Sequence, residues 1–315
     1  MSQTPNILRL SRTSVCDATP FATRKLRQAG FTLVELLVGL ALTVFISAIA
    51  ITYMYSSTQV FRVQTNDSLS HENARFALEL LSQNIRLAGQ NRPTDISTTL
   101  DVVYNGTACT ADDASNVNGN TSRCTVDTLI PGAGTLASDR LAVDYLAIGD
   151  ITGCNGTVFN ATTLAPLHLV NVFWVADLDA NGISSLYCQT IDATANGASN
   201  VNGGTAQPLI DGIDAMQIQY GVSTGASTEL IQRYQSYTNL IAQGGVAATR
   251  NVKAIRLALL VNSGLGSQDG DGNAEVSLEI ADNRTYQLLD ETLNIDDDQV
   301  FRQVYSTTIA IPNTF

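Results

Sequence analysis

The pattern of apolar and polar residues divides the chain near Pro93. Residues 31–55 are largely apolar and contain a single acidic residue, Glu35. A helix of this length is sufficient to cross the hydrocarbon core of a bilayer, which is about 30 Å thick. We therefore expect a membrane-spanning helix that begins close to Phe31.

The helical pattern continues beyond this apolar run. Apolar residues return at intervals of three or four, which places them on one face of a helix. No proline interrupts the chain between Phe31 and Pro93, and Gly89 followed by Pro93 is typical of a helix end. The pattern predicts one helix from about Phe31 to Ala88. Its second half should pack on a globular domain through Ala74, Leu78, Leu81, Ile85 and Ala88.

After Pro93 the pattern changes to short alternating runs separated by Gly, Asn, Ser and Asp, which predicts an antiparallel sheet. Two runs alternate strictly and predict half-exposed strands, Gln217–Val222 and Glu275–Ile280. Two more continuous apolar runs, Leu169–Ala176 and Ile255–Val261, predict central strands, and the last strand is expected between Val300 and Ile311.

One further amphipathic helix is expected on the sheet, between Thr228 and Gln243, because apolar residues recur there at helical spacing. The whole pattern therefore predicts an α+β fold. A long N-terminal helix, half transmembrane and half amphipathic, would pack on a mainly antiparallel β-sheet headpiece.

Charge is distributed unevenly along the chain. Residues 1–30 hold five basic residues and one acid, a net charge of +4, whereas the remainder carries −16. The positive-inside tendency would keep the leader in the cytoplasm and send the C-terminal bulk outward. An acidic mature region argues against direct nucleic-acid binding, because that binding relies on Lys and Arg to neutralise phosphates.

Glu35 is the anomaly of the apolar run. A carboxylate in the middle of a membrane helix costs about 2.5 to 3.5 kcal/mol by insertion scales, so it is expected to serve a function and to have a partner. If the chain is cut after Gly30, Phe31 acquires a free α-amino group four residues before Glu35. Amine and carboxylate could then pair between neighbouring subunits.

The residues around this acid resemble a known signal. Lys25 to Gly30, followed by Phe31-Thr32-Leu33-Val34-Glu35, is similar to the type III signal of type IV prepilins and pseudopilins. The resemblance implies that a membrane prepilin peptidase cuts after Gly30 and that Phe31 becomes N-methylated. It also implies that Glu35 guides docking into a growing filament.

Two other interpretations of the segment remain open. A plain signal anchor would leave Glu35 in the first turn of its helix, where the helix dipole favours an acid. An ordinary secretory signal would be cut after Ala48-Ile49-Ala50, so that the mature chain would start at Ile51. An acid inside the apolar region opposes the secretory interpretation, and the N-terminus of the mature chain distinguishes them.

Cysteine usage fits an exported protein. Cys16 lies in the leader, and four cysteines remain in the mature region, which allows three pairings. We expect Cys109 to pair with Cys124 and Cys154 with Cys188, because each pairing closes a short loop. A zinc site is the alternative, and the absence of a C-x-x-C pair opposes it.

Two acidic loops resemble the opening of a calcium-binding loop. The closing glutamate of an EF-hand is absent, since its position is taken by Cys188 in the first loop and Ile280 in the second. Calcium is therefore a weaker expectation than Asp/Asn/Gly turns, and no other cofactor is expected. The candidate ligands are Asp177, Asp179 and Asn181 in the first loop and Asp269, Asp271 and Asn273 in the second.

No catalytic constellation stands out. Gly221 to Gly225 fits the G-x-S-x-G pattern of a nucleophile elbow, but His71 and His168 both precede Ser223, whereas hydrolases place the base after it. A turn after a strand is the simpler interpretation. We expect no enzyme activity.

The headpiece extends the resemblance. Segments such as Asp139–Leu146, Leu209–Val222 and Val252–Ser263 are similar to the PilW family of minor pilins in their order along the chain. The resemblance implies a leader (1–30), a transmembrane and amphipathic helix (31–90) and a periplasmic headpiece (91–315). It implies a role in starting a pilus at the inner membrane that supports twitching, adhesion or DNA uptake. The implied partners are prepilin peptidase, other minor pilins, the major pilin, a tip adhesin and inner-membrane lipid.

Two rival functions share much of this pattern. A J-type minor pseudopilin of a type II secretion system would have the same signal, helix and β-rich head. A membrane-anchored periplasmic binding module would not assemble at all, so that Glu35→Ala should be harmless to it.

Overall fold

The computed structural model describes residues 30–90, 125–129, 136–162, 166–176, 183–193, 205–223, 230–244, 249, 251–263, 284–295 and 300–312. The chain forms two units, one ending at Ser56 and one running from Ser57 to Phe315. Helix α1 (Leu33–Ile85) contributes its first half to the first unit and its second half to the second. The predicted long helix is thus confirmed, within three residues at each end.

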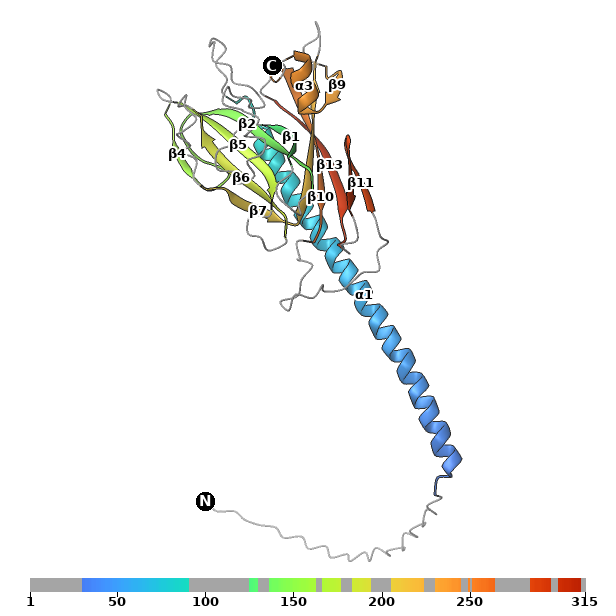
Figure 1. The fold of residues 1–315 in the computed structure, drawn as a ribbon. Coiled ribbons are helices and arrows are strands. Elements are labelled where there is room, and N and C mark those ends of the chain that lie inside the picture. Colours follow the sequence, from blue (N-terminus) through green and yellow to red (C-terminus); the bar gives the residue numbers. More distant parts are fainter. Residues whose placement is uncertain are drawn as a thin grey trace, which may run out of the picture. The chain divides into compact units, whose positions relative to one another are not determined.

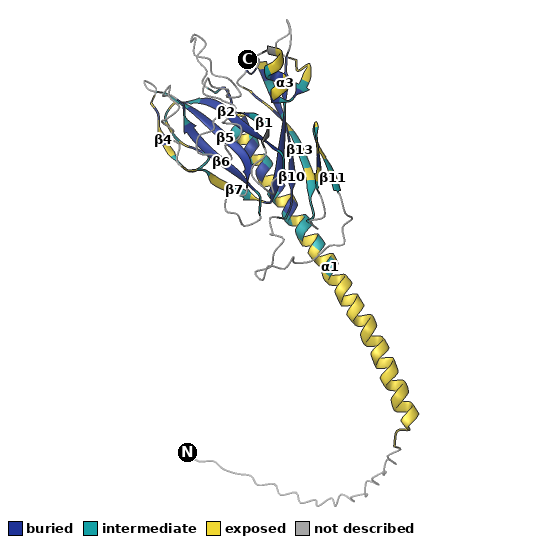
Figure 2. Ribbon diagram, viewed as in Figure 1, coloured by how far each residue is buried: buried dark blue, intermediate teal, exposed yellow. Residues whose placement is uncertain are grey.

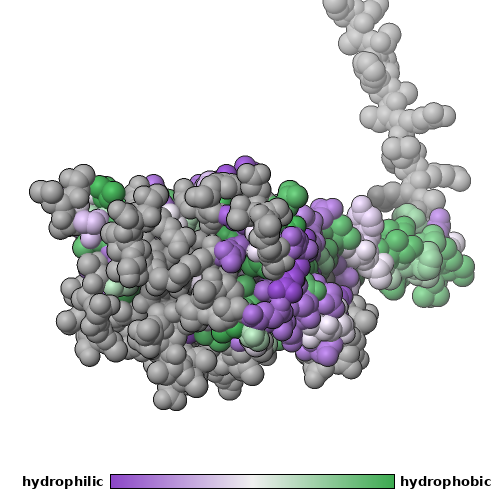
Figure 3. Space-filling view, turned by 90° about the horizontal axis from the view of Figure 1, so that it is seen from above, coloured by the Kyte–Doolittle hydropathy of each residue, from purple (hydrophilic) through white to green (hydrophobic). Residues whose placement is uncertain are grey.

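The first half of α1 is exposed along its whole length (Figure 2). Its large apolar side chains lie in the open, with exposed fractions between 53% for Val38 and 75% for Leu33 and Tyr53. Figure 3 shows these side chains as a hydrophobic surface, whereas the described surface of the second unit carries many hydrophilic side chains.

The second half of α1 is amphipathic and carries the core-facing stripe predicted from the sequence. Leu81, Ile85 and Ala88 are fully buried, and Leu78 is partly buried. Gly89 ends the helical region: its φ of 68° favours glycine, and its N–H donates to the Asp144 carbonyl oxygen at 2.8 Å. The helix end is therefore fixed to a strand of the head.

Within the described ranges, all strand pairs of the head are antiparallel, and the strands form two larger sheets and two hairpins (Figure 1). A five-stranded sheet has the order β1-β2-β5-β6-β7, and a four-stranded sheet has the order β13-β10-β8-β9. The strands of the first are β1 (Val126–Leu129), β2 (Ser138–Ala147), β5 (Leu167–Ala176), β6 (Ser185–Asp192) and β7 (Gln207–Asp211). Those of the second are β8 (Ile213–Val222), β9 (Arg233–Gln235), β10 (Val252–Val261) and β13 (Gln303–Ala310). The hairpins are β3 (Asp150–Thr152) with β4 (Val158–Asn160) and β11 (Arg284–Leu288) with β12 (Glu291–Ile295).

The two sheets share one hydrophobic core with the second half of α1. Leu81 and Ile85 of the helix belong to the same buried cluster as Phe173 of β5, Met216 of β8 and Leu257 of β10. Burying this stripe accounts for the amphipathic pattern, since helix stability in proteins comes mainly from packing an apolar face.

Side chains from β2 join the two sheets. The Ser138 hydroxyl accepts a hydrogen bond from the Met216 N–H at 3.0 Å, and the Asp139 carboxylate accepts one from the Ile218 N–H at 2.7 Å. These polar side chains of β2 satisfy backbone donors of β8 that would otherwise be buried without a partner. The sheets therefore meet through side-chain contacts rather than through a continuous backbone ladder.

The predicted central strands are confirmed. Leu169–Ala176 lies in β5, between β2 and β6, and Ile255–Val261 lies in β10, between β13 and β8. The last predicted strand corresponds to β13. The strand expected at Glu275–Ile280 lies outside the described residues.

The prediction that Gln217–Val222 forms a half-exposed strand was right for the strand and wrong for its exposure. These residues form the C-terminal part of β8. Nearly every side chain of β8 is buried, and Gln217 is only 4% exposed. The β11–β12 hairpin packs Leu288 and Leu293 on Ala215 of this strand. The face expected to meet solvent is therefore covered by a later part of the chain.

The helix predicted between Thr228 and Gln243 was only half right. Arg233–Gln235 forms strand β9 on the edge of β8, and α3 begins at Tyr237 and ends at Gly244. Tyr234 packs close to Gly221, where an added Cβ would lie 2.8 Å from the tyrosine ring. The Asp127 carboxylate accepts the N–H groups of Tyr237 and Thr238 at 2.9 and 2.6 Å, which fixes the start of α3.

Candidate processing and assembly site

The segment Gly30–Glu35 forms the entry to helix α1. Gly30, Phe31 and Thr32 are not helical, and the helix begins at Leu33. The Thr32 hydroxyl accepts the Glu35 N–H at 3.3 Å, and the Thr32 carbonyl accepts the Leu36 N–H at 3.2 Å. Thr32 is therefore the N-cap, and Thr-x-x-Glu has the spacing of a capping box. This cap is a role that the sequence interpretation missed, although its pattern was visible there.

The peptide bond between Gly30 and Phe31 is accessible. Phe31 is 81% exposed, and a Cβ added to Gly30 would meet no heavy atom within 4 Å. Packing within this chain therefore does not require glycine at position 30. A requirement for glycine there would come from a molecule that approaches the backbone closely.

Glu35 is the single charged residue between Leu33 and Phe61. It lies in the first helical turn, where the helix dipole favours a carboxylate. Its side chain is exposed, and no described residue forms a hydrogen bond or ion pair with its carboxylate. The carboxylate is thus accessible to a cation from another molecule.

Helix α1 is long and apolar enough to cross a membrane, and it is the one such helix among the described residues. None of the residues of its most apolar window is buried inside the protein. A helix that is apolar on all sides and lacks a protein partner is typical of a membrane span.

The predicted disulfide between Cys154 and Cys188 is confirmed. Cys154 lies in the turn of the β3–β4 hairpin and Cys188 lies in β6, with Cα atoms 6.1 Å apart. The bond therefore attaches this hairpin to the five-stranded sheet. Cys109 and Cys124, the other expected pair, lie outside the described residues.

A buried polar network supports the same hairpin. The Asn171 amide donates to the side-chain oxygen of Asn84 at 2.9 Å and accepts the Thr190 hydroxyl at 2.7 Å. Thr190 in turn accepts the Cys154 N–H at 2.8 Å. The network connects the end of α1 to β5, β6 and the disulfide loop, and sequence reasoning missed it. Its one signal was Asn171 itself, a polar residue inside an apolar run.

Tyr145 lies at the edge of this network, and its hydroxyl donates to Asn171 at 3.4 Å. Burial raises the pKa of Tyr145 to about 12, and the hydrogen bond with Asn171 lowers it in part. The phenol therefore stays protonated and can act as a donor throughout the physiological range.

The residues proposed for calcium, Asp177, Asp179, Asn181, Asp269, Asp271 and Asn273, all lie outside the described residues. Within the described ranges, no group of three or more His, Cys, Asp or Glu residues could hold a metal ion.

The two histidines lie in different places. His71 on α1 contacts the Tyr305 hydroxyl at 3.0 Å and lies 3.7 Å from the Asp67 carboxylate, while His168 on β5 contacts the buried Asp144. Ser223 follows directly after β8, and the residues expected to continue the turn lie outside the described part of the chain. Each histidine thus has contacts that stabilise the head.

Comparison with known proteins gives two matches. Residues 172–313 match the family described as Type IV Pilus-assembly protein W, and residues 25–51 match the prokaryotic N-terminal methylation motif. No curated protein and no solved structure matches the chain.

The two matches cover the start of helix α1 and the C-terminal part of the head. The methylation motif includes Gly30, Phe31 and Glu35 at the start of the apolar helix. The PilW match begins in β5 and ends just after β13, so it includes the four-stranded sheet. A membrane-anchored helix that enters a β-rich head fits both. The motif implies processing by prepilin peptidase and assembly with other pilins, and together the matches show that the chain is similar to PilW-like type IV pilins and support a minor-pilin role in pilus assembly.

Proposed function

We propose that this minor pilin helps to start a type IV pilus at the inner membrane and stays in the filament as a structural subunit. Prepilin peptidase would cut after Gly30, and Phe31 would become the methylated N-terminus. The head would lie in the periplasm, and the subunit would perform no catalytic step itself. The observation that carries the proposal is the accessible segment Gly30–Glu35 at the start of an apolar helix whose side chains are exposed.

The local geometry supports cleavage at this position. Peptidases bind their substrates as extended backbone, and residues 30–32 are the last non-helical residues before α1. Glycine at position 30 would let the backbone approach the peptidase closely, since it has no Cβ.

The charge of the segment supports pairing between subunits. Cleavage creates an amine at Phe31, close to the lipid phase, and the Glu35 carboxylate of a neighbouring subunit is a suitable partner. Both charges are costly in hydrocarbon when alone, and a charge-assisted hydrogen bond between them offsets part of that cost. Their four-residue offset allows one subunit's amine to meet another's acid when the helices are staggered by about one turn, or about 5.4 Å.

A Glu35→Ala substitution tests the proposal. The variant should be cut after Gly30 and reach the membrane normally, but its incorporation into pili should fall at least about ten-fold, as a charged hydrogen bond contributes about 1.5 to 3 kcal/mol. Quantitative mass spectrometry of sheared pili and membranes measures both.

Glu72→Ala is the matched control, because Glu72 is an exposed acid on the second half of the same helix. It should incorporate as well as the unmodified chain. Equal incorporation of the Glu35→Ala variant would overturn the role proposed for Glu35, whereas absence of the unmodified chain itself from pili would favour an anchored module that does not assemble. Loss of protein secretion with normal pili would favour the J-type pseudopilin.

A further inference from the structure

The edge strands of the two sheets differ in how well they are protected against pairing with another chain. β9 has three residues, and β1 has four residues and an irregular register with β2. β7 contains Pro208 and a register shift. β13 has eight residues in unbroken register with β10. Short strands, prolines and irregularities are common means of blocking edges, and β13 has none of them.

The backbone of β13 has a defined outer side. The Ile311 N–H donates to the Lys253 carbonyl oxygen at 2.9 Å, which sets the alternation of the hydrogen bonds along the pair. Counting back from Ile311, every second residue of β13 forms backbone hydrogen bonds with β10. The residues that alternate with these direct their N–H and C=O groups away from β10. These residues are Val304, Ser306, Thr308 and Ala310, and their side chains are exposed.

Among the described strands, β13 pairs with β10 alone. Its sequence, QVYSTTIA, contains no charged residue. An uncharged strand with free backbone groups on one side is a template for an added strand.

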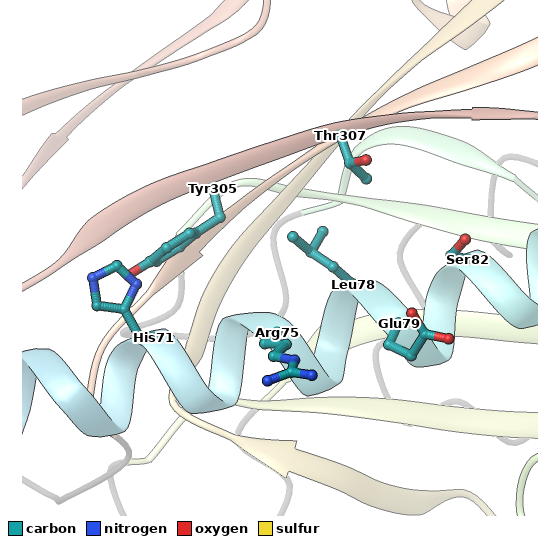
Figure 4. A pocket seen from close by; sticks show the side chains of 7 residues that line it. All are labelled: His71, Arg75, Leu78, Glu79, Ser82, Tyr305 and Thr307. Atoms are coloured by element: carbon teal, nitrogen blue, oxygen red, sulfur yellow. The ribbon is translucent and has the colours of Figure 1, made fainter.

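A groove lies beside this strand, between β13 and the second half of α1 (Figure 4). It has a volume of about 500 Å³ and combines apolar and charged lining. Figure 4 shows Tyr305 and Thr307 of β13 on one side and Arg75 and Leu78 of the helix on the other. Its further lining residues are His71, Glu79 and Ser82.

Arg75 and Glu79 place one positive and one negative side chain in the groove. Glu79 accepts a hydrogen bond from Gln83 at 2.9 Å, whereas Arg75 makes no hydrogen bond or ion pair within the described residues. An exposed guanidinium of this kind can bind a carboxylate with two parallel hydrogen bonds.

We propose that the free edge of β13 takes up an extended strand from a different protein chain of the pilus, one that carries an acidic residue facing Arg75. The added strand bonds to the outward backbone groups of β13, and its alternate side chains enter the groove beside Leu78. This inference rests on the proposed function, because it requires the chain to work inside an assembly.

The direction of β13 argues against a second copy of this chain as the partner. Asp67 contacts Gln303 and His71 contacts Tyr305, so the helix and the strand run in the same direction. Two β13 edges that pair antiparallel, as all strands of this head do, would direct the two α1 helices oppositely. Subunits anchored in one membrane need parallel helices, so antiparallel pairing of two β13 edges is ruled out.

Hydrogen exchange of the full-length chain tests this proposal. The chain purified in detergent is compared with the chain in pili recovered from cells, and the β13 amides are resolved by mass spectrometry with residue-level fragmentation. The amides of Ser306 and Thr308 should exchange about five- to ten-fold more slowly in pili, since one added hydrogen bond contributes about 1 to 1.5 kcal/mol. The amide of Thr307, which bonds to β10, should change little.

Substitutions at Ser306 and Arg75 test which contacts cause the slower exchange. Ser306→Pro removes an outward N–H while leaving the ladder to β10 in place, and it should abolish the added protection at Thr308. Ser306→Ala is its control and should behave like the unmodified chain. Arg75→Glu, at an exposed position that does not endanger folding, should weaken the protection about ten-fold, whereas Arg75→Lys should retain most of it.

Each outcome separates the proposals. If cleaved chains assemble but the β13 amides exchange equally in detergent and in pili, this inference alone fails. Protection confined to α1 would also overturn it, as would cross-links between β13 strands of isotopically distinct copies. If the unmodified chain keeps its leader and enters no assembly, the proposed function fails and the strand proposal fails with it.

Discussion

The two halves of helix α1 share one backbone conformation but differ in what buries their side chains. In the first half, Leu40 is 55% exposed and its apolar neighbours are similarly open. In the second half, Leu81 is fully buried between the sheets. The comparison shows that apolar residues in a helix do not by themselves identify a core. The first half needs lipid or neighbouring subunits, while the head supplies the surroundings of the second.

The largest expected effect comes from placing a charge in each half. Leu81→Asp loses buried apolar contact and leaves an unpaired charge in the core, which should destabilise the head by at least about 5 kcal/mol. Leu40→Asp should leave the stability of the head unchanged, although it adds about 2.5 to 3.5 kcal/mol to membrane insertion. Urea unfolding of the full-length chain in detergent, followed by the fluorescence of the single tryptophan, Trp174, measures the difference.

If both substitutions changed the unfolding midpoint equally, the two halves would not differ as described. Trp174 is suited to this measurement because it lies in β5 of the head and is 1% exposed. Its fluorescence reports on the second unit alone.

The disulfide should have the next largest effect. Replacing Cys154 and Cys188 by alanine should cost about 3 to 4 kcal/mol in the chain-entropy model, since the bond spans 34 residues. The single Cys188→Ala variant should lose nearly as much as the double variant, because either change removes the bond. Exposure of the first half of α1 should not change, so membrane insertion should be normal. A double variant with unaltered unfolding would show that the bond does not stabilise the head.

Replacing a glycine by alanine adds one methyl group, and this change should have different effects in the head and in the first half of α1. A Cβ at Gly153 would lie 2.4 Å from the Thr190 hydroxyl, whereas a Cβ at Gly39, in the first half of α1, would meet nothing within 4 Å. Gly153→Ala should therefore disturb the Thr190 network and cost about 1 to 3 kcal/mol. Gly39→Ala should leave the unfolding midpoint of the head unchanged. Equal tolerance of both substitutions would contradict the close approach at Gly153.

The smallest expected effect appears at alkaline pH. Burial raises the pKa of Tyr145 from 10.0 to about 12, so the folded head keeps a proton that the unfolded chain releases. This contribution to stability is fully present below pH 10 and is lost as the pH rises toward 12. At pH 11 the loss is about 1 kcal/mol. Tyr145→Phe should reduce the slope of stability against pH in that window by about one proton, and an unchanged slope would contradict the assignment.

The long helix could be predicted because its signals are local. The apolar stripe that ends at Ile85 and Ala88 has a helical period, and Gly89 stops the helix through its positive φ. The central strands β5 and β10 were predicted for a similar reason, since both are continuous apolar runs. Gly30, Phe31 and Glu35 were proposed as site residues from the sequence alone, and their roles stay predictions. The structure adds a capping role for Thr32, whose hydroxyl accepts the Glu35 N–H.

The elements that could not be predicted depend on distant partners. Strand β2 is buried although it contains Asp139 and Asp144, which resemble loop residues in the sequence alone. Asp139 accepts a backbone N–H of β8 some 79 positions later, and Asp144 contacts His168. Likewise, Tyr234 fits a helical spacing, yet its backbone pairs with Gly221 of β8. Pairings between residues so far apart in the sequence produce no periodic pattern of apolar residues. The division into two sheets therefore could not be predicted either.

The mass of the N-terminal peptide of the mature chain tests the central claim most directly. The chain is recovered from cell membranes without exposure to added protease, and its first peptide is sequenced by mass spectrometry. We predict that it begins at Phe31 and carries one N-methyl group. A chain that still begins with its leader, or one that begins at Ile51, would contradict the account of a processed pilin subunit.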